Sequence, residues 1–170
     1  DLLPVLEGTQ FERNRAAAAK ALGRILKDAP PSDEIEKVAQ ALIADFGDKY
    51  LDVRRETVQA CGMIGPAAKA CVPHLPPLFV DDRPPPAQPE PCYMVRHAAA
   101  WTAGRMGAHA AVHIDRLIAM LHGELNIATP VLFAIGEIGP VQDNVAPNLV
   151  TRLQKVIAGG GFYAAPRGFT

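Results

Sequence analysis

Aromatic residues, serine and long hydrophobic runs are scarce in this chain, and each shortage narrows what it can be. Aromatic residues make up only 6% of the 170 residues while hydrophobic residues make up 49%, so the core must be built from Ala, Leu, Val and Ile. Side chains of this size favour helices packed closely together. Ser32 is the only serine and is expected to cap a helix, so no Ser/His/Asp catalytic set is predicted. No hydrophobic run reaches the roughly 18 residues of a membrane-spanning helix, so no membrane partner is predicted.

The charge is balanced, which argues against a strongly electrostatic partner. Lys and Arg number 17 and Asp and Glu number 18, for a net charge of −1, so no nucleic-acid partner is predicted. The three cysteines, Cys61, Cys71 and Cys92, have no metal-ligand spacing and are expected to be reduced and mostly buried. Because one pair could form a disulfide in an oxidising compartment, the cysteines do not fix the localisation, and the cytoplasm is only slightly favoured.

One pattern recurs along the chain. The segment 53–65 returns at 95–107 and 127–139, and more loosely at 14–26. An internal repeat of this length is typical of helical solenoids, so we predict an all-α solenoid (superhelix) of about four antiparallel helix pairs. The predicted divisions are residues 1–8 as the end of a preceding repeat, units at 9–46, 50–80, 92–122 and 126–157 within an array spanning 9–157, an extended and exposed proline-rich insertion at 81–91, and a glycine-rich tail or linker at 158–170.

Two glycines in each copy of the pattern have different expected roles. Gly65, Gly107 and Gly139 stand where the first helix of a unit should end, and a left-handed cap requires glycine there. The other set lies inside the helix, where glycine costs about 1 kcal/mol relative to alanine, so a neighbouring helix is expected to pass too close for a Cβ atom. This set consists of Gly62, Gly104 and Gly136, with Gly23 in the loose copy.

The second helix of each unit carries an apolar stripe at i, i+3, i+7 spacing, as in Val72, Leu75 and Phe79. Pro73 lies early in this helix, so the helix should begin near Cys71 or be kinked at its entry.

The first unit has signals of its own. Thr9 and Glu12 predict a capping box for a helix over 11–26. Ser32, followed by two acidic residues, predicts the start of a second helix that runs to about Phe46.

The repeated pattern resembles the HEAT repeat, in the short form named after the phycobilisome lyases. The resemblance rests on Val53-Arg54, Val95-Arg96, the paired glycines and Val72-Pro73-x-Leu75, and it covers residues 11–157. It implies a HEAT-like solenoid in which Arg54 and Arg96 join a ladder between repeats. The third copy has Ala128 at that position and departs from the pattern. This repeat serves many unrelated proteins, so it implies little about activity.

Some proteins of this repeat class are enzymes, and their signatures are missing from the sequence. Deoxyhypusine hydroxylases bind iron through His-Glu dipeptides, whereas no histidine here precedes a glutamate. DNA glycosylases of this class would need a cationic concave face with aromatic residues, which the balanced charge and single tryptophan disfavour. His109 and His113 have the spacing of a metal pair on a helix, but two ordinary, partly exposed histidines are the preferred interpretation. No catalytic residue, metal or cofactor is predicted.

Side chains at one shared position of the first helices form a candidate surface. These are Lys20, Gln59, Trp101 and Phe133, polar in the early units and aromatic in the late ones. The aromatic pair Trp101 and Phe133 indicates either an apolar patch for a partner or packing between units.

A second row of side chains lies on the second helices, which line the concave side in solenoids of this family. His74, Arg116 and Asn148 share this position and form the candidate groove for a partner peptide, although a solvated helix face has the same pattern. The proline-rich insertion is either a recognition segment itself or an exposed loop.

The sequence therefore predicts a non-catalytic interaction or scaffold module that presents a concave helical surface to a protein or peptide and belongs to a larger protein. Two alternatives stay open. One is an enzyme or enzyme subunit of the phycobilin-lyase type, as the resemblance implies. The other is a structural spacer that makes end-to-end contacts through the open half-repeat at residues 1–8.

Overall fold

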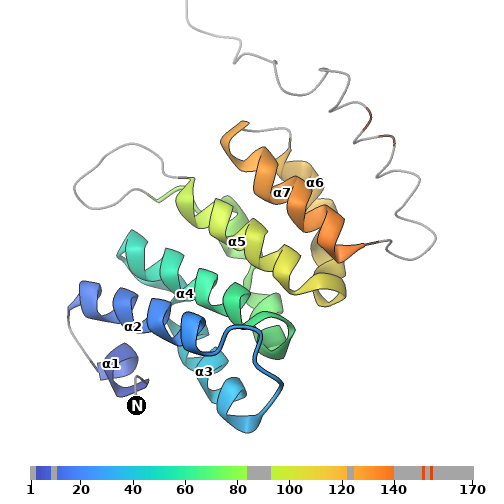
Figure 1. Ribbon diagram of the computed structural model, residues 1–170. Helices are drawn as coiled ribbons and strands as arrows, with labels where there is room; N and C mark the ends of the chain where they lie inside the picture. The colour runs from blue at the N-terminus through green and yellow to red at the C-terminus, as the bar shows by residue number, and fades with distance from the viewer. Residues whose placement is uncertain are drawn as a thin grey trace, which may run out of the picture.

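The computed structural model describes residues 3–8, 11–83, 93–121 and 125–139, together with Thr151 and Gln154. Within these ranges every regular element is helical and no strand occurs, so the all-α prediction is confirmed (Figure 1). The elements, with η denoting a 3-10 helix, are α1 (Leu3–Gly8), α2 (Glu12–Ile25), α3 (Asp33–Ala44), η1 (Asp45–Gly47), α4 (Leu51–Ile64), η2 (Gly65–His74), η3 (Pro76–Val80), α5 (Met94–Arg105), η4 (Gly107–His113), α6 (Ile114–Met120) and α7 (Leu125–Ile138).

The helices lie in two layers. Helices α2, α4, α5 and α7 each pack against the next and form the layer nearer the viewer in Figure 1. Behind them α3 packs against η2, η2 against η4, and η3 against α6. The core between the layers is aliphatic, as the composition predicts. Phe46 and Phe79 are the buried aromatic residues in the described part of the chain.

Several helix ends follow the sequence signals. Ser32 is the N-cap of α3, and its Oγ accepts a hydrogen bond from the backbone N–H of Ile35 at 3.2 Å, which confirms the predicted cap. The three predicted end glycines, Gly65, Gly107 and Gly139, all have positive φ, at 78°, 55° and 77°. At Gly65 the ψ angle is −148°, a region open almost only to glycine, so the turn from α4 into η2 depends on this residue.

The predicted capping box at Thr9 and Glu12 is wrong. Helix α2 begins at Glu12, and its N-cap is Phe11, whose backbone is extended with φ −88° and ψ 111°. Glu12 is therefore the first residue of the helix and cannot reach back to the cap from the third position. Thr9 lies outside the described residues.

The second element of the middle units differs from the predicted α-helix. Residues 65–74 and 76–80 form 3-10 helices, with a non-helical residue at Ala68. Pro73, Pro76 and Pro77 disfavour an α-helix here, because the proline ring clashes with the carbonyl four residues earlier and has no N–H to donate to it. In the next unit, residues 107–113 form a 3-10 helix and residues 114–120 form an α-helix.

The glycines inside the first helices mark close helix crossings. A Cβ atom on Gly23 would lie 2.7 Å from the Cα of Ala60, and one on Gly104 would lie 2.8 Å from the Cα of Ala134. A Cβ on Gly62 would lie 2.5 Å from the ring of Trp101. The close approach predicted at these positions is confirmed. At Gly136 a Cβ would meet nothing within 4 Å among the described residues, so the same explanation does not hold there.

Candidate functional site

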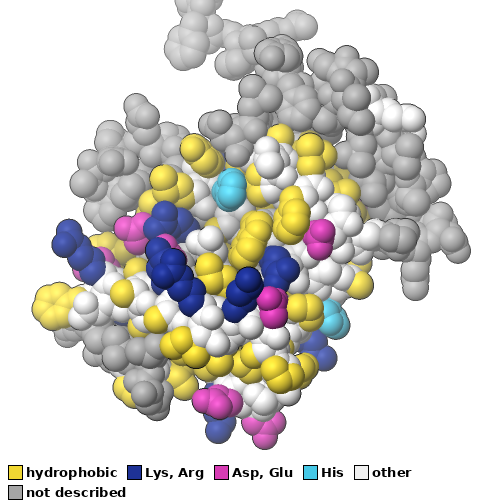
Figure 2. Space-filling model, viewed as in Figure 1, with side chains coloured by type: hydrophobic (Ala, Val, Ile, Leu, Met, Phe, Trp, Pro, Cys, Tyr) yellow, Lys and Arg dark blue, Asp and Glu magenta, His cyan; other side chains and the backbone are white. Residues whose placement is uncertain are grey.

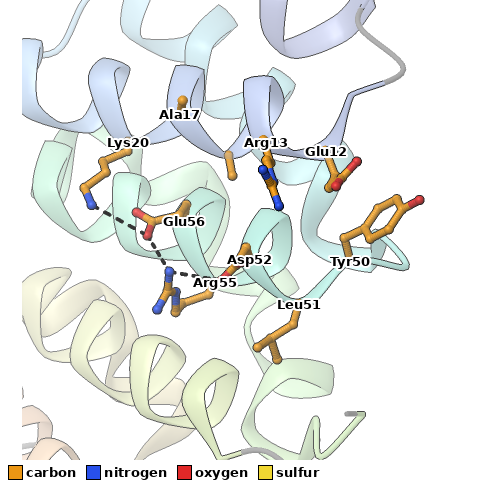
Figure 3. Close-up of a pocket in the computed structure, with 10 residues that line it drawn as sticks. Glu12, Arg13, Ala17, Lys20, Tyr50, Leu51, Asp52, Arg55 and Glu56 are labelled. Carbon is orange, nitrogen blue, oxygen red and sulfur yellow. Dashed lines mark hydrogen bonds and ion pairs between the residues drawn. The ribbon is translucent and has the colours of Figure 1, made fainter. Parts of the chain in front are cut away.

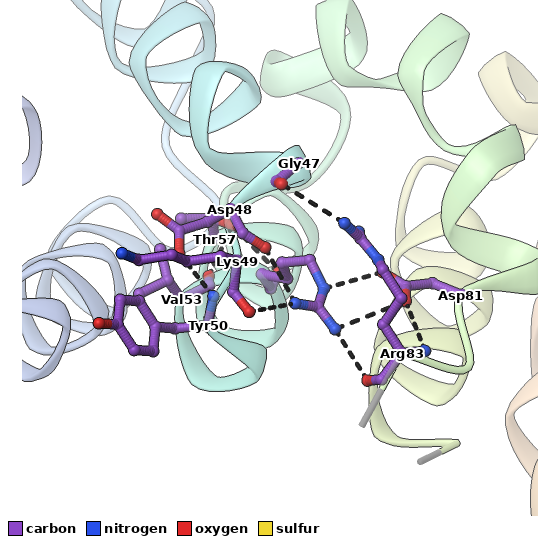
Figure 4. A network of polar contacts seen from close by, with 9 residues as sticks. Gly47, Asp48, Lys49, Tyr50, Val53, Thr57, Asp81 and Arg83 are labelled. Atoms are coloured by element: carbon purple, nitrogen blue, oxygen red, sulfur yellow. Dashed lines mark hydrogen bonds and ion pairs between the residues drawn. The ribbon is translucent and has the colours of Figure 1, made fainter. Parts of the chain in front are cut away.

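Arg54 is the most deeply buried charged group in the described part of the chain. Its side chain is 0% exposed, and its Nε lies 2.8 Å from Oδ2 of Asp81 (Figure 4). The guanidinium also donates to the carbonyl oxygens of Asp48 at 2.9 Å, Lys49 at 3.1 Å and Arg83 at 3.0 Å. Arg54 thus ties the turn before α4 to the segment that follows η3. These contacts make Arg54 a structural residue.

Asp81 is buried, although the sequence predicted that the insertion at 81–91 is exposed throughout. Its carboxylate meets Arg54 on one side and accepts from the Arg83 guanidinium at 2.7 Å on the other. Burial alone would raise the pKa of Asp81, but the hydrogen bonds from Arg83 and the charges of Arg54 and Arg83 outweigh it and hold this pKa below its ordinary value of 3.8. The rest of the insertion, from residue 84, lies outside the described residues.

The lowered pKa of Asp81 predicts a pH-dependent contribution to stability. Because the folded-state pKa lies below the unfolded-state value, the ionised carboxylate stabilises the fold above pH 3.8, and this stability is lost as the pH falls through the folded-state pKa. Asp81→Asn should therefore be less stable than the wild type at pH 7 by about 1.5–3 kcal/mol, the range for hydrogen bonds to charged groups.

Urea unfolding at pH 7 and at pH 3 tests this expectation, and the gap between the two proteins should narrow at pH 3. The raised pKa of Asp45, which burial causes, acts in the opposite sense but is present in both proteins and cancels in the difference. A gap that stays constant across this pH range would contradict the assignment.

The two histidines considered as a metal pair have unrelated surroundings. His113 is buried, not partly exposed as predicted, and its Nε2 lies 2.8 Å from the carbonyl oxygen of Val72. Its ring meets Phe79 edge-on with the centroids 5.8 Å apart. His109 is exposed, and 3-10 geometry over 107–113 breaks the α-helical spacing that a pair would need. No group of three His, Cys, Asp or Glu side chains in the described ranges is placed to hold a metal.

Cys61 and Cys71 are buried free thiols. Burial, and after it the neighbouring Cys71, raises the pKa of Cys61 well above its ordinary value. The thiolate is the reactive form, so the Cys61 thiol is poorly suited to nucleophilic chemistry near neutral pH. Cys92 lies outside the described residues.

Arg116 lies at the edge of an apolar groove where η3 meets α6. It is exposed on α6, and the groove has a volume of about 320 Å³. Phe79 and Val80 of η3 and Met120 of α6 supply apolar walls, and the Val80 side chain is 73% exposed. The full lining is Pro76, Phe79, Val80, Arg96, Arg116, Ala119, Met120 and Ile127. We call this the Arg116 groove.

The other members of the predicted concave row are not part of the Arg116 groove. His74 is exposed at the end of η2 and does not line it, and Asn148 lies outside the described residues. Arg96, singled out from the sequence for its place in the repeat, does line it. The sequence did not single out Val80 or Met120 for binding. Val80 directly follows the apolar stripe of its helix, a position that could have indicated an uncovered side chain.

The aromatic row of the first helices contributes to packing between units. Trp101 lies over Gly62, and the Phe133 ring lies over Gly104. Both side chains keep exposed area, which is 36% at Phe133. Gln59 is half-buried and lines a cleft with Trp101, while Lys20 forms an ion pair with Glu56 at 4.0 Å.

The chain matches no protein-family model, and no curated protein matches its sequence. Among the described residues, no helix combines the length and the hydrophobicity that crossing a bilayer requires. The functional argument therefore rests on the surfaces themselves.

Proposed function

We propose that this chain is a non-catalytic interaction module, built as a solenoid of HEAT-like repeats, that docks a peptide segment of a partner protein in the Arg116 groove. The observation that carries the proposal is the groove itself, which combines apolar walls, including the exposed Val80, with the guanidinium groups of Arg96 and Arg116. Ligand pockets commonly combine apolar walls with a few polar groups that fix the orientation of the ligand. A peptide with a hydrophobic side chain next to a carboxylate matches these apolar walls and guanidinium groups.

The order of packing supports the solenoid part of the proposal. Successive first helices contact one another in chain order, and so do successive second elements. This nearest-neighbour arrangement is the property that defines repeat arrays. A surface built on packed helices is already shaped before the partner arrives, so little conformational entropy is lost on binding.

The chemistry of the described residues supports a binding role over an enzymatic one. The Nε2 atom of His113 lies within hydrogen-bond distance of the Val72 carbonyl oxygen. The Cys61 thiol is buried, and its pKa is raised. Neither group has the exposed, activated setting of a catalytic nucleophile or base. No specific contact among the described residues favours the chromophore-lyase or spacer alternatives.

Selection from a displayed library of random peptides tests the proposal. The whole chain should enrich peptides that place a hydrophobic residue beside an acidic one. Arg116→Glu should weaken the best of them at least tenfold, because it repels the carboxylate that the native guanidinium attracts. Lys37→Glu is the matched control, since Lys37 is exposed on α3 and does not line the groove, and it should bind as the wild type does.

Folding of each variant is checked by circular dichroism. Peptides that bind Arg116→Glu and the wild type equally would contradict the proposed site. Failure to enrich any peptide on the wild-type chain would contradict the proposed function.

A further inference from the structure

Trp101 stands between two clefts on the layer formed by α2, α4, α5 and α7. One cleft, of about 480 Å³, is lined by Arg24, Lys27 and Asp28 of α2 and the turn after it, with Met63, Trp101, Arg105 and Phe133. The other, of about 430 Å³, lies between α4 and α5 and is lined by Tyr93, Met94 and His97 among others. We call the two clefts with Trp101 between them the Trp101 face. Figure 2 views the molecule from this layer and shows Lys and Arg side chains beside hydrophobic ones.

The first cleft carries a local surplus of positive charge. It contains three cations, Arg24, Lys27 and Arg105, and a single acid, Asp28. Asp28 is already hydrogen-bonded to the Arg105 guanidinium. Arg24 and Lys27 form no ion pair with any described residue, so the charge that remains in this cleft is theirs.

A neighbouring cleft on the same layer shows the contrast. This cleft, of about 440 Å³, lies between α2 and α4 (Figure 3), and its three cations are matched by three acidic residues. Arg55 lies 3.1 Å from Asp52 and 2.8 Å from Glu56, and Lys20 lies 4.0 Å from Glu56. An anion would have to compete with these carboxylates, so of these two clefts only the one that holds Arg24 and Lys27 has uncompensated positive charge.

The second cleft is lined mainly by apolar side chains, whereas basic side chains dominate the first. Tyr93 and Met94 are 38% and 40% exposed, and no acidic residue lines this cleft. His97 and Gln59 add polar atoms to this cleft. Arg55 also lines it, but its guanidinium is paired with Asp52 and Glu56. Large exposed hydrophobic side chains beside a rigid aromatic residue are the usual anchors of protein interfaces.

We propose that the Trp101 face binds a short acidic peptide segment that carries a hydrophobic side chain. The carboxylates contact Arg24 and Lys27, and the hydrophobic side chain packs beside Trp101 against Tyr93 and Met94. Arg24 and Lys27 can pair with one or two carboxylates. A nucleic acid has a phosphate at every nucleotide and would need a longer row of basic side chains, which the net charge of −1 argues against. This surface lies on the opposite layer from the Arg116 groove and does not depend on it.

Trp101 makes the test direct because it is the only tryptophan in the chain. Its fluorescence therefore reports on this face alone. The probe is a pool of tryptophan-free peptides that alternate acidic and hydrophobic residues. Two comparison probes are the same pool with lysine in place of each acid and a single-stranded oligonucleotide. Binding of the acidic pool should change the Trp101 emission and should weaken as salt is raised.

Charge reversal identifies the residues responsible. The double variant Arg24→Glu, Lys27→Glu should weaken the acidic pool at least tenfold, while Arg13→Glu in the self-neutralised cleft should leave it unchanged. Both variants change exposed residues, and their helical content is checked by circular dichroism. The proposal is overturned if the lysine pool or the oligonucleotide binds as well as the acidic pool, or if the acidic pool leaves the emission unchanged.

Discussion

Replacing Arg54 with methionine should remove about 3–5 kcal/mol from the free energy of unfolding, the usual effect of breaking a buried ion pair by removing one partner. The substitution leaves the Asp81 carboxylate, only 2% exposed, without its nearest buried cation. It also removes the donor for the carbonyl groups of Asp48, Lys49 and Arg83. Unsatisfied buried acceptors add to the loss.

Arg55→Met is the matched control for Arg54→Met. Arg55 is next in sequence on the same helix but is 33% exposed. Its ion pair with Asp52 lies at the surface, and its buried partner Glu56 keeps Lys20 as a second partner at 4.0 Å. A surface ion pair contributes about 0–1 kcal/mol, and Glu56 is not left without a cation, so the control should lose much less stability than Arg54→Met. Urea unfolding followed by circular dichroism measures both. Equal stability of Arg54→Met and Arg55→Met would show that the Arg54 network contributes little to the fold.

The same substitution should have opposite effects at two aligned glycines. Gly104→Ala places a Cβ atom 2.8 Å from the Cα of Ala134, a backbone atom that cannot turn away, so α5 and α7 must separate. Overpacking of this kind costs about 1–3 kcal/mol. Gly136→Ala meets nothing within 4 Å among the described residues and should gain up to about 1 kcal/mol from the higher helix propensity of alanine.

Thermal unfolding of the two alanine variants beside the wild type measures this difference. The melting temperature should fall for Gly104→Ala and stay level or rise for Gly136→Ala. A fall of similar size in both would mean that Gly136 also lies at a tight crossing. No change in either would contradict the close packing of α5 against α7.

The features that the sequence predicted well are those that depend on one residue type in one local setting. Glycine at a helix end or at a helix crossing has few substitutes, which is why Gly65 and Gly62 could be interpreted from the repeat. Ser32 is similar, because its hydroxyl reaches only its own helix. Such signals need no knowledge of distant contacts.

The features that the sequence missed depend on distant partners or on competing preferences. Nothing local indicates that Arg54 pairs with Asp81, which lies 27 residues away in a segment that composition marked as an exposed insertion. The apolar stripe of the second element predicted an α-helix, but successive prolines made it a 3-10 helix. The Arg116 groove likewise arises only when η3 and α6 come together.

The most direct test of the proposed function is a methyl NMR spectrum of the whole chain, recorded with and without the best peptide from the library selection. The Arg116 groove predicts chemical-shift changes that cluster at the methyl groups of Val80, Met120 and Ile127, which line or border the peptide site. Methyl groups in the core between α2 and α4 should stay unchanged, because the surface is already formed. Shifts confined to other surfaces, or spread through the whole core, would contradict a preformed docking groove at Arg116.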